Sequence, residues 1–131
     1  MRSLRPWLQL VRLPAVFTAM ADVFLGFLLT HSGIVELGPS GTIAFLLLLT
    51  ASSGLYLAGM VFNDVFDWKT DLKERPERPI PSGRIALRSA VVFGGFLVLM
   101  GIGAAQASGW PSLSVALLLT LAIFAYDAYL K

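Results

Sequence analysis

The sequence predicts an all-α integral membrane protein with about four transmembrane helices. Of its 131 residues, 56% are hydrophobic and 14% are charged. The mean hydropathy is +0.77, which lies outside the range of an ordinary soluble domain. Four apolar runs follow one another along the chain, and each approaches the length that crosses a bilayer. The lysines and arginines lie beside these runs, as membrane-flanking residues do.

Composition also limits the kinds of site that the chain can hold. Cysteine is absent, so neither disulfides nor thiolate metal sites are expected. The net charge is +2 and the isoelectric point is about 9.3. Because the basic residues border apolar runs, we attribute them to the lipid bilayer and expect no nucleic-acid partner.

The N-terminal part is predicted to be a short interfacial helix followed by the first span. Residues 1–13 combine three arginines with Trp7, an aromatic residue of the kind enriched at the membrane interface. The first span is expected over Pro14–Thr30, near the short end of the membrane-crossing range. Asp22 lies within it. An acid at membrane depth should face the bundle interior, either as a polar contact between helices or as part of the site.

The second span is predicted over Thr42–Phe62, after a loop at His31–Gly41 that contains glycines and a proline. Small residues in this span suit close helix packing. We expect the helix to continue through Asn63 and to end near Arg75, because Pro76 disfavours a helical residue before it.

The third span is predicted over Ile85–Ala107 and the fourth over Leu113–Leu130, with a tight turn at Ser108–Ser112 between them. Four glycines in the third span are expected to form a packing face: Gly94, Gly95, Gly101 and Gly103.

The positions of the basic residues predict the orientation. The loops 31–41 and 108–112 contain no lysine or arginine, whereas the segment between the second and third spans is rich in both. The positive-inside rule therefore places both termini and the segment Asn63–Arg84 in the cytoplasm. We expect a multi-pass protein of the cell membrane, with a bacterial inner membrane as the first assumption.

That polar segment, Asn63–Arg84, holds the candidate site. Asn63, Asp67 and Asp71 follow at i, i+4 and i+8, so on a helix they drift by only about 40° per step and form one column. Asp64 can join its edge. We expect these acids to stand at a helix end, outside the packed core. Oxygen ligands of this kind suit Mg²⁺, which usually takes one or two carboxylates and shares the rest with water and phosphates.

Basic side chains follow the acids directly. Lys73, Arg75 and Arg78 would suit the binding of a phosphate group. The alternative for the whole segment is a solvated, charged loop between two membrane helices.

Two motifs in this segment resemble the UbiA-type membrane prenyltransferases. The pattern Asn63-xxx-Asp67-xxx-Asp71 resembles the first Asp-rich motif of that family, and ERPERPIPSGR at Glu74–Arg84 resembles the R-P-x-P-x-G segment after it. The resemblance implies Mg²⁺-dependent transfer of a prenyl group from a polyprenyl diphosphate to an acceptor, which the sequence does not identify. It also implies roles for these residues. Asp67 and Asp71 would be catalytic, and the metal would be held by Asn63, Asp64, Asp67 and Asp71. The diphosphate would be bound by Lys73, Arg75 and Arg78.

The C-terminus carries a partial match to another family feature, a tyrosine and a lysine on the fourth helix close to the diphosphate. Tyr126 and Lys131 would fill these roles, but they stand five residues apart where the family pattern has four. An ion pair between Asp127 and Lys131 is the alternative.

The family has about nine membrane helices and a second Asp-rich motif, so the resemblance implies the first half of such a bundle. We therefore expect residues 1–131 to be a single transmembrane unit, a fragment of a larger prenyltransferase domain. A truncated gene, or two copies that assemble together, are the alternatives. By itself the chain should bind diphosphate weakly and transfer no prenyl group, because catalysis needs preorganised groups around the developing charge.

Two other functions remain open from the sequence. One is a non-catalytic membrane subunit or a degenerate relative, which would keep the spans without binding diphosphate. The other, less favoured, is a phosphatidyl-alcohol transferase, whose motif requires D-G-x-x-A-R where this chain has Trp68 and Lys69 after Asp67.

Overall fold

The computed structural model describes residues 4–30 and 38–130, and these residues form helices joined by turns and loops, with no strand among them. The elements are α1 (Arg5–Leu10), α2 (Leu13–Thr30), α3 (Gly38–Phe66), α4 (Trp68–Glu74), α5 (Leu87–Ser108), α6 (Trp110–Ala125) and a π-helical turn, η1 (Tyr126–Leu130). Four helices are long and apolar enough to cross a membrane: α2, α3, α5 and the continuous helix Trp110–Tyr129. The predicted all-α fold with four spans is therefore confirmed.

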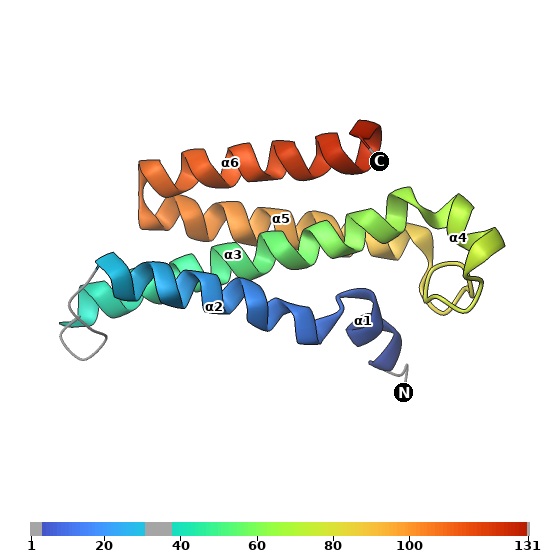
Figure 1. Cartoon of the computed structure of the whole chain (residues 1–131), viewed down its shortest axis with the longest axis horizontal. Coiled ribbons are helices and arrows are strands. Elements are labelled where there is room, and N and C mark those ends of the chain that lie inside the picture. The colour runs from blue at the N-terminus through green and yellow to red at the C-terminus, as the bar shows by residue number, and fades with distance from the viewer. Residues whose placement is uncertain (1–3, 31–37, 131) are drawn as a thin grey trace.

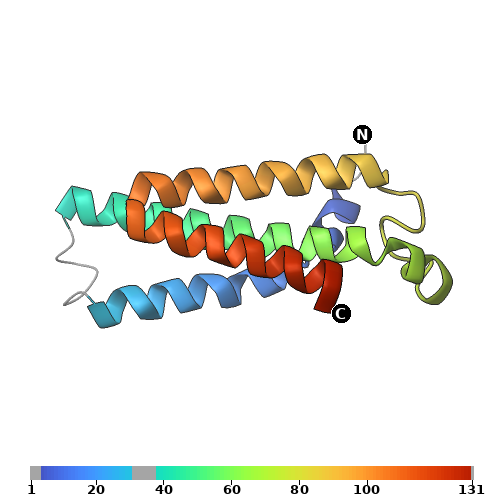
Figure 2. The same cartoon turned by 90° about the horizontal axis from the view of Figure 1, so that it is seen from above.

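The long helices lie side by side around α3, as the two views in Figures 1 and 2 show. Helix α3 packs against α2, α5 and α6, and its contact with α5 is the most extensive. Short helix α1 and the turn before α2 lie at the same end of the bundle as α4 and the 75–86 loop (Figure 1). The polar segment and the N-terminal helix are thus brought together from distant parts of the sequence.

All four spans begin at a different residue from the one predicted, and the starts of α3 and α6 differ most. Helix α3 begins at Gly38 instead of Thr42, because Pro39 is tolerated in a first helical turn where its missing N–H has no partner to lose. Between α5 and α6 only Gly109 is non-helical, with φ of 122°, a conformation that favours glycine. The predicted turn at Ser108–Ser112 is therefore shorter than expected, and α6 begins at Trp110.

The predicted continuous helix from α3 to Arg75 is also interrupted. Asp67 lies in a turn between α3 and α4, although backbone hydrogen bonds continue across it, from Asp67 N to Asn63 O at 3.1 Å and from Asp71 N to Asp67 O at 2.8 Å. The helix ends before Pro76, as predicted.

Glycines allow α5 to approach α3 closely at two of the four predicted positions. A Cβ added at Gly94 would lie 2.9 Å from Phe62 Cε2, and one added at Gly101 would lie 2.9 Å from Leu55 Cγ. At Gly95 and Gly103 no atom lies within 4 Å of such a Cβ. The packing face therefore consists of Gly94 and Gly101, together with a close approach at Gly54 on α3, where the added Cβ would lie 3.2 Å from Leu97 O.

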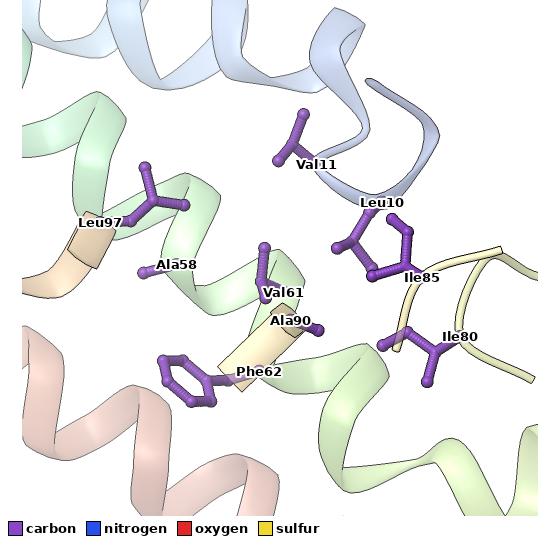
Figure 3. Close-up of a cluster of buried hydrophobic side chains, with 9 residues drawn as sticks. All are labelled: Leu10, Val11, Ala58, Val61, Phe62, Ile80, Ile85, Ala90 and Leu97. Atoms are coloured by element: carbon purple, nitrogen blue, oxygen red, sulfur yellow. The ribbon is translucent and has the colours of Figure 1, made fainter. Parts of the chain in front are cut away.

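A buried apolar cluster fixes the polar end of the bundle (Figure 3). It joins α1, α3, α5 and the 75–86 loop through Leu10, Val11, Ala58, Val61, Phe62, Ile80, Ile85, Ala90 and Leu97. The loop is also held by its own backbone, since Ser82 N donates to Arg78 O and Ile85 N donates to Pro79 O. This packing gives the loop and α1 fixed positions beside the end of α3.

Candidate functional site

Two buried carboxylates from α3 and α4 share one arginine. Asp64 is 6% exposed and Asp71 is 4% exposed. The Nη1 atom of Arg78 lies 3.4 Å from Asp64 Oδ1 and 2.6 Å from Asp71 Oδ2. Residues seven apart in a helix differ by only about 20° around the axis, so the two acids present their side chains to the same side. Asp64, which was predicted at the edge of the column, is thus part of the cluster through its pairing with Arg78.

A second arginine reaches Asp64 from the N-terminal part of the chain. Arg12 Nη2 lies 3.2 Å from Asp64 Oδ1, across 52 residues of sequence. Arg12 stands at the junction of α1 and α2 with φ of 47°, the single positive φ outside glycine among the described residues. This conformation is uncommon for a residue with a Cβ. Arg12 was not predicted as a site residue, because nothing in its local pattern distinguishes it from a membrane-flanking arginine.

Each buried carboxylate of the cluster contacts at least one guanidinium group. Two carboxylates face two guanidinium groups, and Asn63 Nδ2 lies 3.5 Å from Asp64 Oδ1. Buried charges persist in proteins when they are paired and hydrogen-bonded, since removal from water is otherwise too costly. The expectation that these acids lie outside the packed core is therefore wrong for Asp64 and Asp71.

The loop that carries Arg78 is tied to α1 by Arg84. The Arg84 guanidinium donates to Gln9 Oε1 at 2.9 Å and to Ser82 Oγ at 3.0 Å, and it also donates to the carbonyl oxygen of Glu77. These bonds join the loop to the N-terminal helix and so help to hold Arg78 and Arg12 beside the same oxygen of Asp64.

The other predicted site residues lie around this cluster or apart from it. Asp67 is half-buried at the start of α4, and Lys73 and Arg75 are exposed on α4 and just after it. Tyr126, in η1, is 54% exposed. Lys131 lies outside the described residues, and so does its predicted contact with Asp127.

Asp22 lies on α2, well away from the carboxylate cluster in sequence. It is exposed and lines a cavity of about 570 Å³ bounded by α2, α3, α5 and α6. Among the described residues that line this cavity, Asp22 is the one charged side chain. Because Asp22 is exposed, the prediction that it faces the bundle interior is not confirmed.

The donor set can be tested against a magnesium ion. Within residues 4–30 and 38–130, no three His, Cys, Asp or Glu side chains gather as a preformed metal site. However, oxygens of Asp64 and Asp71 converge on the same cationic nitrogen of Arg78. Such a pair matches the one or two carboxylates that Mg²⁺ takes when phosphates and water complete its shell. The residues present therefore fit this metal as part of a shared site.

Comparison with known proteins gives a consistent result. Residues 19–131 match the model of the UbiA prenyltransferase family. The digeranylgeranylglyceryl phosphate synthase of Saccharolobus solfataricus is 33% identical over 130 residues, which cover 98% of this chain and 44% of that protein. The synthase of the same name from Metallosphaera sedula is 33% identical over 129 residues, covering 98% and 43% of the two chains.

A solved structure shares the fold. The chain superimposes on a digeranylgeranylglyceryl phosphate synthase with a TM-score of 0.89 and 26% sequence identity, covering 98% of this chain and 44% of that one. The chain thus spans less than half the length of these relatives.

Proposed function

This chain belongs to the UbiA prenyltransferase family, and we propose that its carboxylate–arginine cluster binds a prenyl diphosphate together with Mg²⁺ for prenyl transfer. The observation that carries the proposal is the convergence of Asp64 and Asp71 on one cationic atom at the end of the membrane helices. Family membership supplies the reaction class, and the cluster supplies a place for its charged substrate.

In this proposal the oxygens of Asn63, Asp64, Asp67 and Asp71 hold the metal. When bound, Mg²⁺ would act as a Lewis acid and template that neutralises the diphosphate. Arg78 would exchange its carboxylate partners for diphosphate oxygens, a bidentate interaction for which guanidinium groups are well suited. Lys73 and Arg75, which are exposed beside it, would add positive charge around the leaving group, and Tyr126 and Lys131 would contribute from the C-terminal helix.

The reaction then needs little covalent participation by the protein. The bond between the allylic carbon and the diphosphate oxygen breaks, and its electron pair leaves with the diphosphate. A nucleophilic oxygen of the acceptor attacks the allylic cation, and its proton passes to the released diphosphate or to water outside the site. Exclusion of water from the complete site would protect the cation from capture.

The relatives suggest the two substrates. Their name denotes a glyceryl phosphate that carries two geranylgeranyl groups. Synthesis of such a product by prenyl transfer would use geranylgeranyl diphosphate as the donor and a glyceryl phosphate lipid with one geranylgeranyl group as the acceptor. We propose this pair for the present chain, with the site on the cytoplasmic side in accordance with its basic residues.

The chain by itself is proposed to bind the donor without transferring it, since groups beyond the described cluster would be needed to surround the diphosphate. A second half or a second copy would supply them. The test uses the purified chain in detergent with radiolabelled geranylgeranyl diphosphate and the glyceryl phosphate acceptor. We expect Mg²⁺-dependent retention of label and no product from the monomer.

The possible results separate the alternatives. Multiple turnovers from a monomer would show that one chain suffices, whereas turnover confined to a dimer fraction would favour two assembled copies. Failure to retain label with Mg²⁺ in every fraction would contradict the proposal and favour a non-catalytic membrane subunit.

A further inference from the structure

Two adjoining hollows lie at the polar end of α5, apart from the carboxylate cluster. The first, of about 540 Å³, lies between α1 and the start of α5, and its lining includes Arg5, Trp7 and Arg84. The second, also of about 540 Å³, runs along α5 from Arg88. Ser89 lines both hollows, so they meet at this residue and are described together as one depression.

The end of this depression nearest α1 is positively charged. Arg84 donates its hydrogen bonds to neutral oxygens of Gln9, Ser82 and the Glu77 carbonyl. The ion pairs found among the described residues involve Arg12 and Arg78, and neither of these lines the hollows. The charges of Arg84 and Arg88 are therefore not neutralised by a carboxylate of the described chain.

The end of the depression that runs along α5, beyond Arg88, is apolar and faces outward from the bundle. Val92 is 72% exposed and Phe96 is 60% exposed, and both line the second hollow together with Phe93. Phe93 packs edge-on against Trp7, with ring centroids 5.1 Å apart. Figure 2 shows α5 along one edge of the bundle, opposite α2. A ligand in the depression would thus meet arginines at one end and exposed apolar side chains of a membrane-spanning helix at the other.

We propose that this depression binds one anionic phospholipid of the surrounding membrane. Its phosphate would lie against Arg84 and Arg88, and an acyl chain would follow Val92, Phe93 and Phe96 along α5. Arginine side chains bind phosphate oxygens through paired hydrogen bonds, and basic pockets between membrane helices bind anionic headgroups. The apolar continuation favours a lipid over a free phosphate ion, which would leave the second hollow unfilled.

The binding site is separate from the proposed catalytic function. The arginines that contact Asp64 and Asp71 are Arg12 and Arg78, so lipid binding at Arg84 and Arg88 requires no change in the cluster. The bound lipid would instead brace α1 against the start of α5, since Trp7 lines the first hollow, Phe93 lines the second, and the two rings pack against each other.

The test measures lipid adducts of the purified chain by native mass spectrometry in a neutral detergent. Dioleoyl phosphatidylglycerol should bind several-fold more tightly than dioleoyl phosphatidylcholine. Arg88→Gln should weaken binding of the anionic lipid roughly fivefold, the effect of one basic residue near an anionic headgroup. Because Arg88 makes no hydrogen bond or ion pair with the described residues, this variant should fold normally, unlike Arg84→Gln, which also removes ties to α1.

Two controls make the result specific. Lys69→Gln removes the same charge from an exposed position on α4 and should leave lipid binding unchanged. Phe96→Ser should weaken binding of the phospholipid but not that of inorganic phosphate. Equal binding of both lipids, an equal loss in Lys69→Gln and Arg88→Gln, or displacement of the lipid by millimolar inorganic phosphate would each overturn the proposal.

Discussion

Replacement of Arg78 by glutamine should destabilise the metal-free protein strongly. Arg78 is the shared partner of Asp64 and Asp71, whose side chains are 8% and 6% exposed. Removing one partner of a buried ion pair leaves an uncompensated charge and typically costs about 3–5 kcal/mol. Arg12 would still neutralise Asp64, and the Arg78 side chain is itself 20% exposed. We therefore expect a loss of about 3 kcal/mol, at the lower end of that range.

The same variant should respond to magnesium more strongly than the unaltered chain, because its two acids no longer have an arginine to share. A cation that binds only the folded state, present at a concentration of about ten times its dissociation constant, would restore about 1.4 kcal/mol of the free energy of unfolding. The assay is unfolding in sodium dodecyl sulfate, followed by circular dichroism, with Mg²⁺ or with EDTA.

Arg75→Gln is the matched control, since Arg75 is exposed on the same loop and its replacement should change stability by less than about 0.5 kcal/mol. If Arg78→Gln lost less than about 1 kcal/mol, the ion pairs would be solvated surface contacts. If Mg²⁺ stabilised the variant no more than the unaltered chain, the acids would not form a cation site.

Three further outcomes are expected. Gly94→Ala should destabilise the α3–α5 contact by about 1–3 kcal/mol, because its Cβ would lie 2.9 Å from a buried ring. Gly95→Ala, which meets open space, should be neutral or stabilising in the same unfolding assay in sodium dodecyl sulfate. Ser82→Cys in intact cells should resist a membrane-impermeant thiol reagent until the membrane is opened, and labelling from outside would reverse the proposed orientation. Without Mg²⁺, Arg12→Gln should lower the free energy of unfolding less than Arg78→Gln does, because Arg12 contacts a single acid and its side chain is 44% exposed. An equal or larger loss would show that Arg12 is the principal partner of Asp64.

The membrane spans were predictable from the sequence, because bilayer thickness imposes a minimum length on every apolar helix. The residues at which the helices begin and end were less predictable. Glycine and proline at 38–41 are typical of a loop, yet both are compatible with a helix start, and the structure places them in the first turn of α3. A tight turn was predicted at 108–112, whereas Gly109 alone is sufficient for the reversal.

The segment that holds the site was predictable from the sequence, but the pairing of its charged side chains was not. The acids of the 63–71 column and Arg78 were identified from spacing, but their pairing depends on the path of the 75–86 loop, which local sequence does not determine. Arg12 reaches Asp64 only because α1 packs against that loop through Leu10 and Ile85. A buried acid at the end of a membrane helix does require a cationic partner, and that requirement was the one signal that could have prompted a search for Arg12.

The central claim is that the acids of the cluster hold a prenyl diphosphate through magnesium. Isothermal titration of geranylgeranyl diphosphate into the purified chain tests it most directly, with Mg²⁺ or EDTA present. Asp71→Asn is compared with Glu74→Gln, which removes an exposed acid three residues away. We predict binding that requires Mg²⁺, is lost in Asp71→Asn and is retained in Glu74→Gln. Equal binding in EDTA, or equal binding by both folded variants, would contradict the claim.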